Sequence, residues 1–144
     1  MFALKIVTPE KIIYDGKSSY LALTTDEGEQ VILDEHAPYM SAIVIGELRY
    51  TNESGTINPY AVSSGYLQIK NNSVYVLLDN AIHSQDINLD EAEEAKKRAE
   101  QLMTQIDTQK DILTLKAQIK LANLHISTAK KYKERNIPKQ PSVA

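Results

Sequence analysis

The residues best suited to chemistry are a short acidic run and three histidines. Asp34, Glu35 and His36 are adjacent and could form an acid–base cluster, which would make the chain a small hydrolase. Three consecutive side chains point in different directions, however, so they rarely converge on one substrate. His83 and His125 stand alone without the spacing of a metal site, and there is no cysteine for thiol catalysis. These patterns favour binding over catalysis, and we expect neither enzymatic activity nor a bound metal.

The composition is that of a soluble globular protein whose two parts differ in charge. Of the 144 residues 42% are hydrophobic and 24% are charged, and the formal net charge is −3. Residues 1–86 hold five Lys or Arg against eleven Asp or Glu, whereas residues 87–144 hold eleven against eight. A basic segment can bind an acidic protein surface, an anionic membrane or a nucleic acid. No aromatic residues interleave with these lysines, which disfavours nucleic acid. No apolar run is long enough to cross a membrane, and no secretory signal is visible.

Residues 2–83 have the pattern of closely spaced short strands. Turn-forming residues recur about every 8–12 positions with β-branched and aromatic residues between them, which is typical of an antiparallel sandwich or barrel. Turns are expected at Asp15-Gly16 and Asn71-Asn72, among others. The expected strands are residues 3–7, 11–14, 18–24, 30–33, 41–45, 47–50, 56–63, 66–70 and 73–78.

From residue 84 the period of the pattern changes from 2 to about 3.6, which predicts two helices. Asn88 is a good N-cap, and acidic residues follow it in the first turn. A face of small and apolar residues then allows close helix packing; it comprises Ala92, Ala95, Ala99, Leu102, Met103 and Ile106. A polar break at residues 105–110 precedes a second helix at 111–135, so the two helices should be antiparallel. We expect an α+β chain with a β-sandwich domain at 1–84, a helical hairpin domain at 85–135 and a disordered tail at 136–144.

The second predicted helix is apolar on two opposite sides. One stripe has the heptad-like spacing of a helix–helix seam and comprises Ile112, Leu115, Ile119, Ala122, Ile126 and Ala129. The second stripe lies about 160° away and comprises Leu113, Ala117, Leu121 and Leu124. A helix with two apolar sides normally lies between two partners. Burying the three leucines of the second stripe would contribute roughly 5–9 kcal/mol at most, so we expect this stripe to exchange one protein surface for another.

Several motifs together resemble the epsilon subunit of the F-type ATP synthase. The pattern EGE at residues 27–29 is followed by HAP at 36–38, and Ser64-Gly65-Tyr66 begins a stretch of the form SGY-L-x-I. With the change from strands to a helix pair, the resemblance covers about residues 2–134. It implies a ten-stranded β-sandwich followed by a helical hairpin, in a non-catalytic rotor subunit that couples ion flow to ATP synthesis.

The resemblance also implies the partners, namely the gamma subunit, the ring of c subunits and the alpha/beta catalytic head. It places the sandwich on gamma and its acidic loop on the c-ring, so the predicted c-ring contacts are Glu29, Asp34, Glu35 and His36. This sequence has Asp34-Glu35 where the family commonly has Pro-Gly, and Val31 where it commonly has Gly. The extra carboxylates suit a basic ring surface, and a merely charged turn explains them equally well.

In the family the hairpin either lies against the sandwich or extends along gamma into the catalytic head, where it blocks ATP hydrolysis. A helix with two apolar sides and a lysine flank suits both states. The residues that the resemblance implies as inhibitory contacts are Leu113, Lys116, Lys120, Leu121, Leu124, Lys130 and Lys131.

Some members of the family bind ATP through a motif of the form Ile/Leu-Asp-x-x-Arg-Ala. The matching positions here are Ile87, Asn88, Glu91 and Ala92, so that an amide replaces the acid and a carboxylate replaces the arginine. A carboxylate in place of a cationic fork repels phosphate. We therefore expect no cofactor and no ATP binding by this chain.

Two other functions stay open on the sequence alone. One is a free-standing β-sandwich adaptor whose hairpin binds a partner coiled coil, and the other is the small hydrolase centred on Glu35 and His36. For the leading hypothesis, the resemblance implies a peripheral position on the cytoplasmic face of a bacterial plasma membrane, held there through the complex, or the organellar equivalent. The resting state of the hairpin and the coupling ion also stay open.

Overall fold

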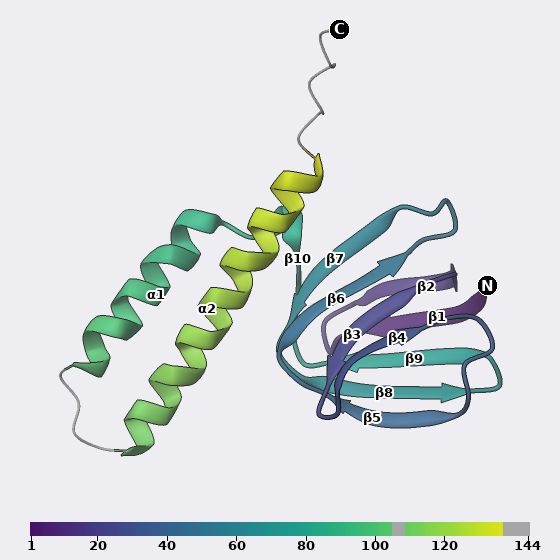
Figure 1. Ribbon diagram of the computed structural model, residues 1–144, viewed down its shortest axis with the longest axis horizontal. Helices are drawn as coiled ribbons and strands as arrows, with labels where there is room; N and C mark the ends of the chain where they lie inside the picture. Colours follow the sequence, from purple (N-terminus) through teal and green to yellow (C-terminus); the bar gives the residue numbers. More distant parts are fainter. Residues whose placement is uncertain (105–108, 137–144) are drawn as a thin grey trace, which may run out of the picture. The chain divides into compact units, whose positions relative to one another are not determined.

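The chain divides into two compact units, Met1–Asp86 and Ile87–Ala144. The computed structural model describes residues 1–104 and 109–136, with side chains for residues 1–104 and 113–133. The first unit holds ten strands and a short 3-10 helix, η1 (Ser84–Asp86), and the second holds two α-helices (Figure 1). The fold class expected from the sequence, strands followed by a helix pair, is confirmed.

The strands of the first unit, which we call the sandwich, form one strongly curled sheet. In chain order they are β1 (Phe2–Val7), β2 (Ile12–Ser18), β3 (Leu21–Thr25), β4 (Gly28–Ile32), β5 (Tyr39–Ile43), β6 (Gly46–Thr51), β7 (Ile57–Val62), β8 (Gly65–Lys70), β9 (Ser73–Leu78) and β10 (Ala81–His83). Their order in the sheet is β10-β7-β6-β3-β5-β8-β9-β1-β2, and β4 pairs with β3. The pairs are antiparallel except that β1 runs parallel to β9, which the expectation of an antiparallel fold did not include.

Alternate residues of the strands point to the inner side of the curled sheet and form one hydrophobic core. Strand β1 shows the pattern clearly, since Phe2, Leu4 and Ile6 are buried and the residues between them are half-buried. Strands β8 and β9 alternate in the same way between buried and more exposed positions. The core cluster comprises Phe2, Leu4, Ile6, Leu21, Leu23, Ile32, Ile43, Leu48, Tyr50, Val62, Leu67, Ile69, Val74, Val76 and Leu78.

The predicted turn at Asp15-Gly16 is wrong, because both residues lie inside β2. Gly16 pairs with Leu4 of β1, and a Cβ atom at this position would lie 2.9 Å from the Tyr14 hydroxyl oxygen. The glycine therefore makes room for a neighbouring ring instead of turning the chain. The actual turn lies earlier, where the Thr8 N–H donates to the Lys11 carbonyl at 2.9 Å. The sequence analysis also missed β10, which is only three residues long.

The β8–β9 turn matches its sequence pattern. Asn71 and Asn72 both have left-handed backbones, with φ of 52° and 57°, and Lys70 pairs with Ser73 across the turn. Two successive left-handed residues define the two-residue turn that matches the twist of a hairpin, and Asn tolerates this conformation better than other side chains do. At the other end of the hairpin, a Cβ atom on Gly65 would lie 2.0 Å from the Leu77 carbonyl oxygen, so this position requires glycine.

The second unit, which we call the hairpin, consists of α1 (Leu89–Met103) and α2 (Gln109–Asn136), which run antiparallel to each other (Figure 1). Asn88 caps α1 as predicted, because its side-chain oxygen accepts the Glu91 N–H at 3.1 Å. Of the described residues of the first stripe of α2, Leu115, Ala122 and Ala129 are buried, and Ile119 and Ile126 are half-buried. On α1 only part of the expected face is buried: the buried residues are Ala92 and Ala99, whereas Ala95 and Leu102 are exposed.

The helix ends differ slightly from the sequence expectations. The polar break was expected at residues 105–110, but α2 already includes Gln109 and Lys110, and residues 105–108 lie outside the described part of the chain. The disordered tail was expected from residue 136, but Asn136 is the last residue of α2. Residues 137–144 lie outside the described residues, as do the side chains of Ile106 and Ile112.

Candidate functional site

The four predicted ring-contact residues lie on β4 and in the segment that follows it. Together we call Glu29, Asp34, Glu35 and His36 the acidic edge. Glu29 lies on β4 opposite Thr24 of β3, and its side chain is largely exposed. Arg49 of β6 places Nη2 3.5 Å from Glu29 Oε1 and Nε 3.5 Å from Glu47 Oε1. One arginine thus lies between two carboxylates, which leaves this part of the surface acidic.

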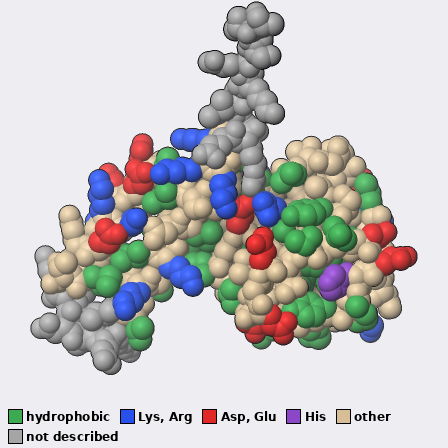
Figure 2. Space-filling view, in the orientation of Figure 1, with side chains coloured by type: hydrophobic (Ala, Val, Ile, Leu, Met, Phe, Trp, Pro, Cys, Tyr) green, Lys and Arg blue, Asp and Glu red, His purple; other side chains and the backbone are tan. Residues whose placement is uncertain are grey.

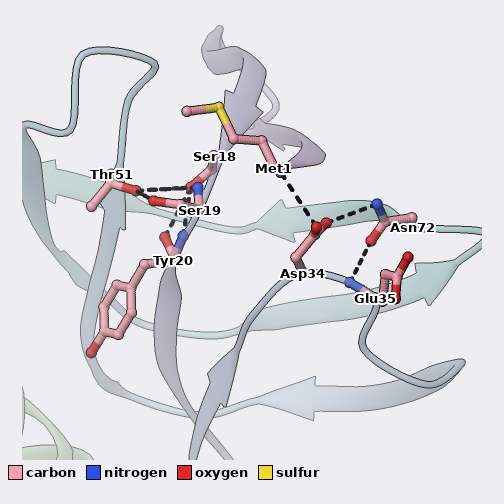
Figure 3. A network of polar contacts seen from close by, with 8 residues as sticks. All are labelled: Met1, Ser18, Ser19, Tyr20, Asp34, Glu35, Thr51 and Asn72. Atoms are coloured by element: carbon pink, nitrogen blue, oxygen red, sulfur yellow. Dashed lines mark hydrogen bonds and ion pairs between the residues drawn. The ribbon is translucent and has the colours of Figure 1, made fainter.

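Asp34 and Glu35 are held by residues that are distant from them in the sequence. The Asn72 side chain donates to Asp34 Oδ1 at 2.9 Å and accepts the Glu35 N–H at 2.8 Å (Figure 3). The amino group of Met1 lies 3.4 Å from the other Asp34 oxygen. The hydrogen bond from Asn72, with a smaller contribution from the Met1 charge, lowers the pKa of the Asp34 carboxyl below its usual value. Asp34 is thus an exposed carboxylate that stays ionised at neutral pH.

His36 is engaged separately from the two acids. Its Nδ1 lies 2.8 Å from the Ala37 carbonyl oxygen, and its ring lies 6.1 Å from the Tyr39 ring. The Tyr39 hydroxyl in turn donates to a carboxylate oxygen of Glu27 at 2.9 Å. Because Asp34 and His36 bind different partners, the segment does not have the shared acid–base geometry of a hydrolase site. Among the described residues no cluster of three potential metal ligands is present either.

The structure reveals an apolar surface that the sequence analysis did not single out. We call Met40, Tyr66, Tyr75 and Leu77 the apolar face. Tyr66 pairs with Leu77 across β8 and β9, and Met40 and Tyr75 both pair with Gln68, so all four point to the outer side of the sheet. Tyr66 is 63% exposed and Leu77 is 56% exposed. Apolar side chains at outward positions of neighbouring strands were the available signal, but it could not be found before the strand pairing was known.

A groove runs alongside the apolar face. It has a volume of about 570 Å³ and lies between the β1–β2 turn, β5, β8 and the end of β9. Its walls are mainly apolar and include Val7, Ile43 and Leu77, and at one end the Ser64 hydroxyl donates to Asp79. An apolar patch that is rimmed by polar groups is typical of a protein–protein contact.

The predicted inhibitory residues divide into exposed and half-buried groups. Leu113 is 67% exposed, whereas Leu121 and Leu124 of the same stripe are half-buried. The four lysines of the prediction, Lys116, Lys120, Lys130 and Lys131, are exposed. Figure 2 shows Lys and Arg side chains spread over the surface of the hairpin. Neither described helix combines the length and the apolar character that crossing a bilayer requires.

The residues at the candidate nucleotide motif act as a helix start. The Asn88 side-chain oxygen is occupied by the Glu91 N–H, Ala92 is buried, and the Glu91 side chain is exposed. The position of the expected cationic fork therefore carries an exposed negative charge. The structure thus gives this motif a role in starting α1.

Comparison with known proteins identifies the family. Residues 1–84 match the family model described as the β-sandwich domain of the ATP synthase delta/epsilon chain. The ATP synthase epsilon chain of Nitratidesulfovibrio vulgaris (strain DP4) is 38% identical over 108 residues, which is 75% of this chain and 80% of that protein. The epsilon chain of Desulforamulus reducens is 36% identical over 109 residues, or 76% and 82% of the two chains.

The chain belongs to the ATP synthase epsilon chain family. It is accordingly a non-catalytic subunit, and the family assignment favours the synthase hypothesis over the adaptor and the hydrolase. The epsilon-type fold is also found in solved structures. A chain of the Euglena gracilis mitochondrial ATP synthase (OSCP/F1/c-ring, rotational state 1) matches with a TM-score of 0.77 and 17% identity, over 85% of this chain and 77% of that chain. A chain of the central stalk and c-ring of the Tetrahymena thermophila mitochondrial enzyme matches with a TM-score of 0.67 and 15% identity, over 88% and 95%.

Proposed function

We propose that this chain is a central-stalk subunit of an F-type ATP synthase, in which the sandwich joins the gamma subunit to the c-ring. The family assignment and the solved central-stalk structures of similar fold support this role. We further propose that the chain works at the cytoplasmic face of a bacterial plasma membrane, where it is held through the complex. The bacterial sources of the relatives support this location.

The observation that carries the proposal is the apolar face. Four large apolar side chains are left in water on the outer side of three paired strands, β5, β8 and β9, whereas the core cluster of the sandwich is buried. Burying an exposed Leu side chain contributes roughly 1.5–3 kcal/mol, so the four residues together could support a stable contact. We assign this face and its neighbouring groove to the gamma subunit, and the acidic edge, with Glu29 and Asp34 exposed, to a basic surface of the c-ring.

The test is co-purification with gamma, using Leu77→Asp as the main variant. A carboxylate in place of Leu77 removes an apolar contact and adds a charge that must be desolvated, so the affinity for gamma should fall at least about tenfold. Ile57→Asp is the matched control because Ile57 is similarly exposed, at 51%, but lies on β7 and outside the apolar face. Equal retention of gamma by both variants and the unchanged chain would contradict the assignment.

We also propose that the two units act as separate domains and that the hairpin inhibits ATP hydrolysis by the complex. Leu113 supports this idea, because its side chain is mostly exposed in this structure. Covering it with a partner surface would contribute favourable free energy through the hydrophobic effect. The exposed lysines beside it suit an acidic partner surface. The hairpin would then need a difference in binding of only a few kcal/mol to move between two sites.

A further inference from the structure

The backbone of the acidic edge is held in an unfavourable conformation. Glu35 has a φ of 57°, in the left-handed region that glycine enters freely and that a side chain such as Glu disfavours. A non-glycine residue keeps this conformation only when surrounding contacts hold it there. Glu35 lies between strands, so the β ladder does not supply those contacts.

Asn72 supplies two of them at once. Its Oδ1 accepts the Glu35 N–H at 2.8 Å and its Nδ2 donates to Asp34 Oδ1 at 2.9 Å, so one planar amide joins two consecutive residues (Figure 3). Asn72 is itself anchored, because its main-chain carbonyl accepts the Ala3 N–H at 3.2 Å and it lies in the tight β8–β9 turn. The position of the segment is thus set by a residue 37 positions away in the sequence.

We propose that Asn72 is the positioning residue of the acidic edge, holding Asp34 and Glu35 in the geometry that this edge presents to a basic partner surface. The partner follows from the proposed function, in which the acidic edge contacts the c-ring. The Asn72 amide fixes the direction of the Asp34 carboxylate and keeps the peptide before Glu35 in place. Without it, Glu35 returns to the more extended backbone that a Glu prefers, and both carboxylates move.

The electrostatics agree with this role. The hydrogen bond from Asn72 is the largest reason why the pKa of Asp34 lies below its usual value, and the Met1 amino group acts in the same direction. The Glu35 side chain is exposed and lies next to Asp34 in the sequence. Asn72 is thus the side-chain donor that ties the Asp34 carboxylate to the β8–β9 turn.

The experiment compares Asn72→Gly with Asn71→Gly in the full-length chain. Glycine suits the left-handed backbone at both positions, so neither change should strain the turn. Asn71 is the matched control because it shares the turn and the backbone conformation, whereas the hydrogen bonds to Asp34 and Glu35 come from Asn72. Carbon-detected NMR should show the Asp34 pKa rising toward its usual value in Asn72→Gly alone. The Glu35 amide should also exchange with solvent about five to ten times faster.

A rescue variant separates positioning from general stability. Glu35→Gly makes the left-handed conformation easy to adopt, so adding Asn72→Gly to it should change the segment's amide shifts far less than Asn72→Gly does alone. A merely structural role of Asn72 in the β8–β9 turn predicts the same change in both backgrounds. That result, or an Asp34 titration that does not respond to Asn72→Gly, would overturn the inference.

The assembled synthase then tests the link to the partner. ATP-driven ion pumping in inverted vesicles, measured for protons and for sodium, should fall severalfold with Asn72→Gly and stay unchanged with Asn71→Gly, while gamma still co-purifies with both. If the NMR responses occur and pumping does not change, Asn72 still positions the segment. In that case the assignment of the acidic edge to the c-ring is what fails.

Discussion

The two units of this chain bury their hydrophobic residues in very different ways. The sandwich encloses large side chains such as Phe2, Leu48 and Leu67, which are at most 1% exposed. The buried residues of the hairpin are mainly alanines, with Leu115 among them, and its large Leu113 is left in water. A buried alanine contributes roughly one methyl group, about 0.8 kcal/mol, which is far less than a buried leucine. The core of the sandwich is therefore strongly stabilised. The contact between α1 and α2, which we call the hairpin seam, costs little free energy to rearrange.

The largest expected effect is on the stability of the sandwich. Leu67→Ala should lower its free energy of unfolding by about 2–5 kcal/mol, because Leu67 is fully buried among large neighbours that cannot fill the cavity. Leu115→Ala should cost less, about 2 kcal/mol, because the other described hydrophobic residues that the hairpin buries are alanines. Tyrosine fluorescence reports the sandwich, which holds all the tyrosines except Tyr132, and ellipticity at 222 nm reports the helices.

Denaturation in urea followed by both signals makes the comparison sharp. Leu67→Ala should shift the fluorescence transition and leave the helical signal largely in place, and Leu115→Ala should do the opposite. If each variant shifted both signals together, the two units would unfold in one transition. The contrast between a stable sandwich core and an easily rearranged hairpin seam would then be wrong.

The second effect is on ATP hydrolysis. Leu113→Asp should leave the stability of the free chain within about 0.5 kcal/mol, because the side chain is already mostly exposed. It should nevertheless raise ATP hydrolysis by the assembled synthase about fivefold or more, which is the lower range of coupling between sites. The measurement is the initial rate of phosphate release by the purified complex.

Leu102→Asp provides the control for that measurement. Leu102 is also an exposed leucine of the hairpin, but it lies on α1 and outside the second stripe. It should leave the rate near that of the unchanged enzyme. Equal activation by both variants would mean that any charge on the hairpin has this effect, and the specific role of the second stripe would have to be given up.

Sequence patterns were most reliable where local chemistry decides the structure. The N-cap at Asn88 and the turn at Asn71-Asn72 follow from side-chain preferences over a few residues, and both are confirmed. Gly16 was misread because its reason is the ring of Tyr14 and its pairing with Leu4, neither of which a local pattern contains. The parallel pairing of β1 with β9 joins the two ends of the sandwich sequence and is equally invisible locally.

The candidate sites show the same limit. The sequence located the acidic edge through its resemblance to a family, but the bridge from Asn72 to Asp34 spans 38 residues and becomes visible only in three dimensions. The apolar face is similar, since it joins outward residues of β5, β8 and β9, each of which looks like an ordinary strand residue by itself. Long-range pairing, which creates both features, is the part of the fold that single-sequence patterns do not encode.

The smallest expected effect concerns acid, and it separates the two units once more because each holds a histidine whose pKa is lowered by burial. His83 Nδ1 accepts the Gln85 N–H at 3.0 Å, and its ring meets Tyr60 edge-on with 4.9 Å between centroids. Burial lowers the pKa of His83, partly offset by the nearby charge of Asp86, and burial also lowers the pKa of His125. Both histidines are therefore neutral in the folded chain at pH 7, and a proton on His83 Nδ1 would face the Gln85 N–H.

The direction of the pH dependence follows from the lowered pKa. Above about pH 6.5, the usual histidine value, folded and unfolded chains are both neutral at these positions and the full stability is present. As the pH falls below that value, the unfolded chain takes up protons first, so stability declines until the folded pKa is passed. Urea midpoints at pH 7.5 and 5.5 should show that His83→Phe, which keeps a ring against Tyr60, reduces the acid loss in the fluorescence signal only. His125→Phe should reduce the acid loss in the helical signal only. If either variant instead changed the acid loss in the signal of the other unit, acid would not act on the sandwich and the hairpin separately.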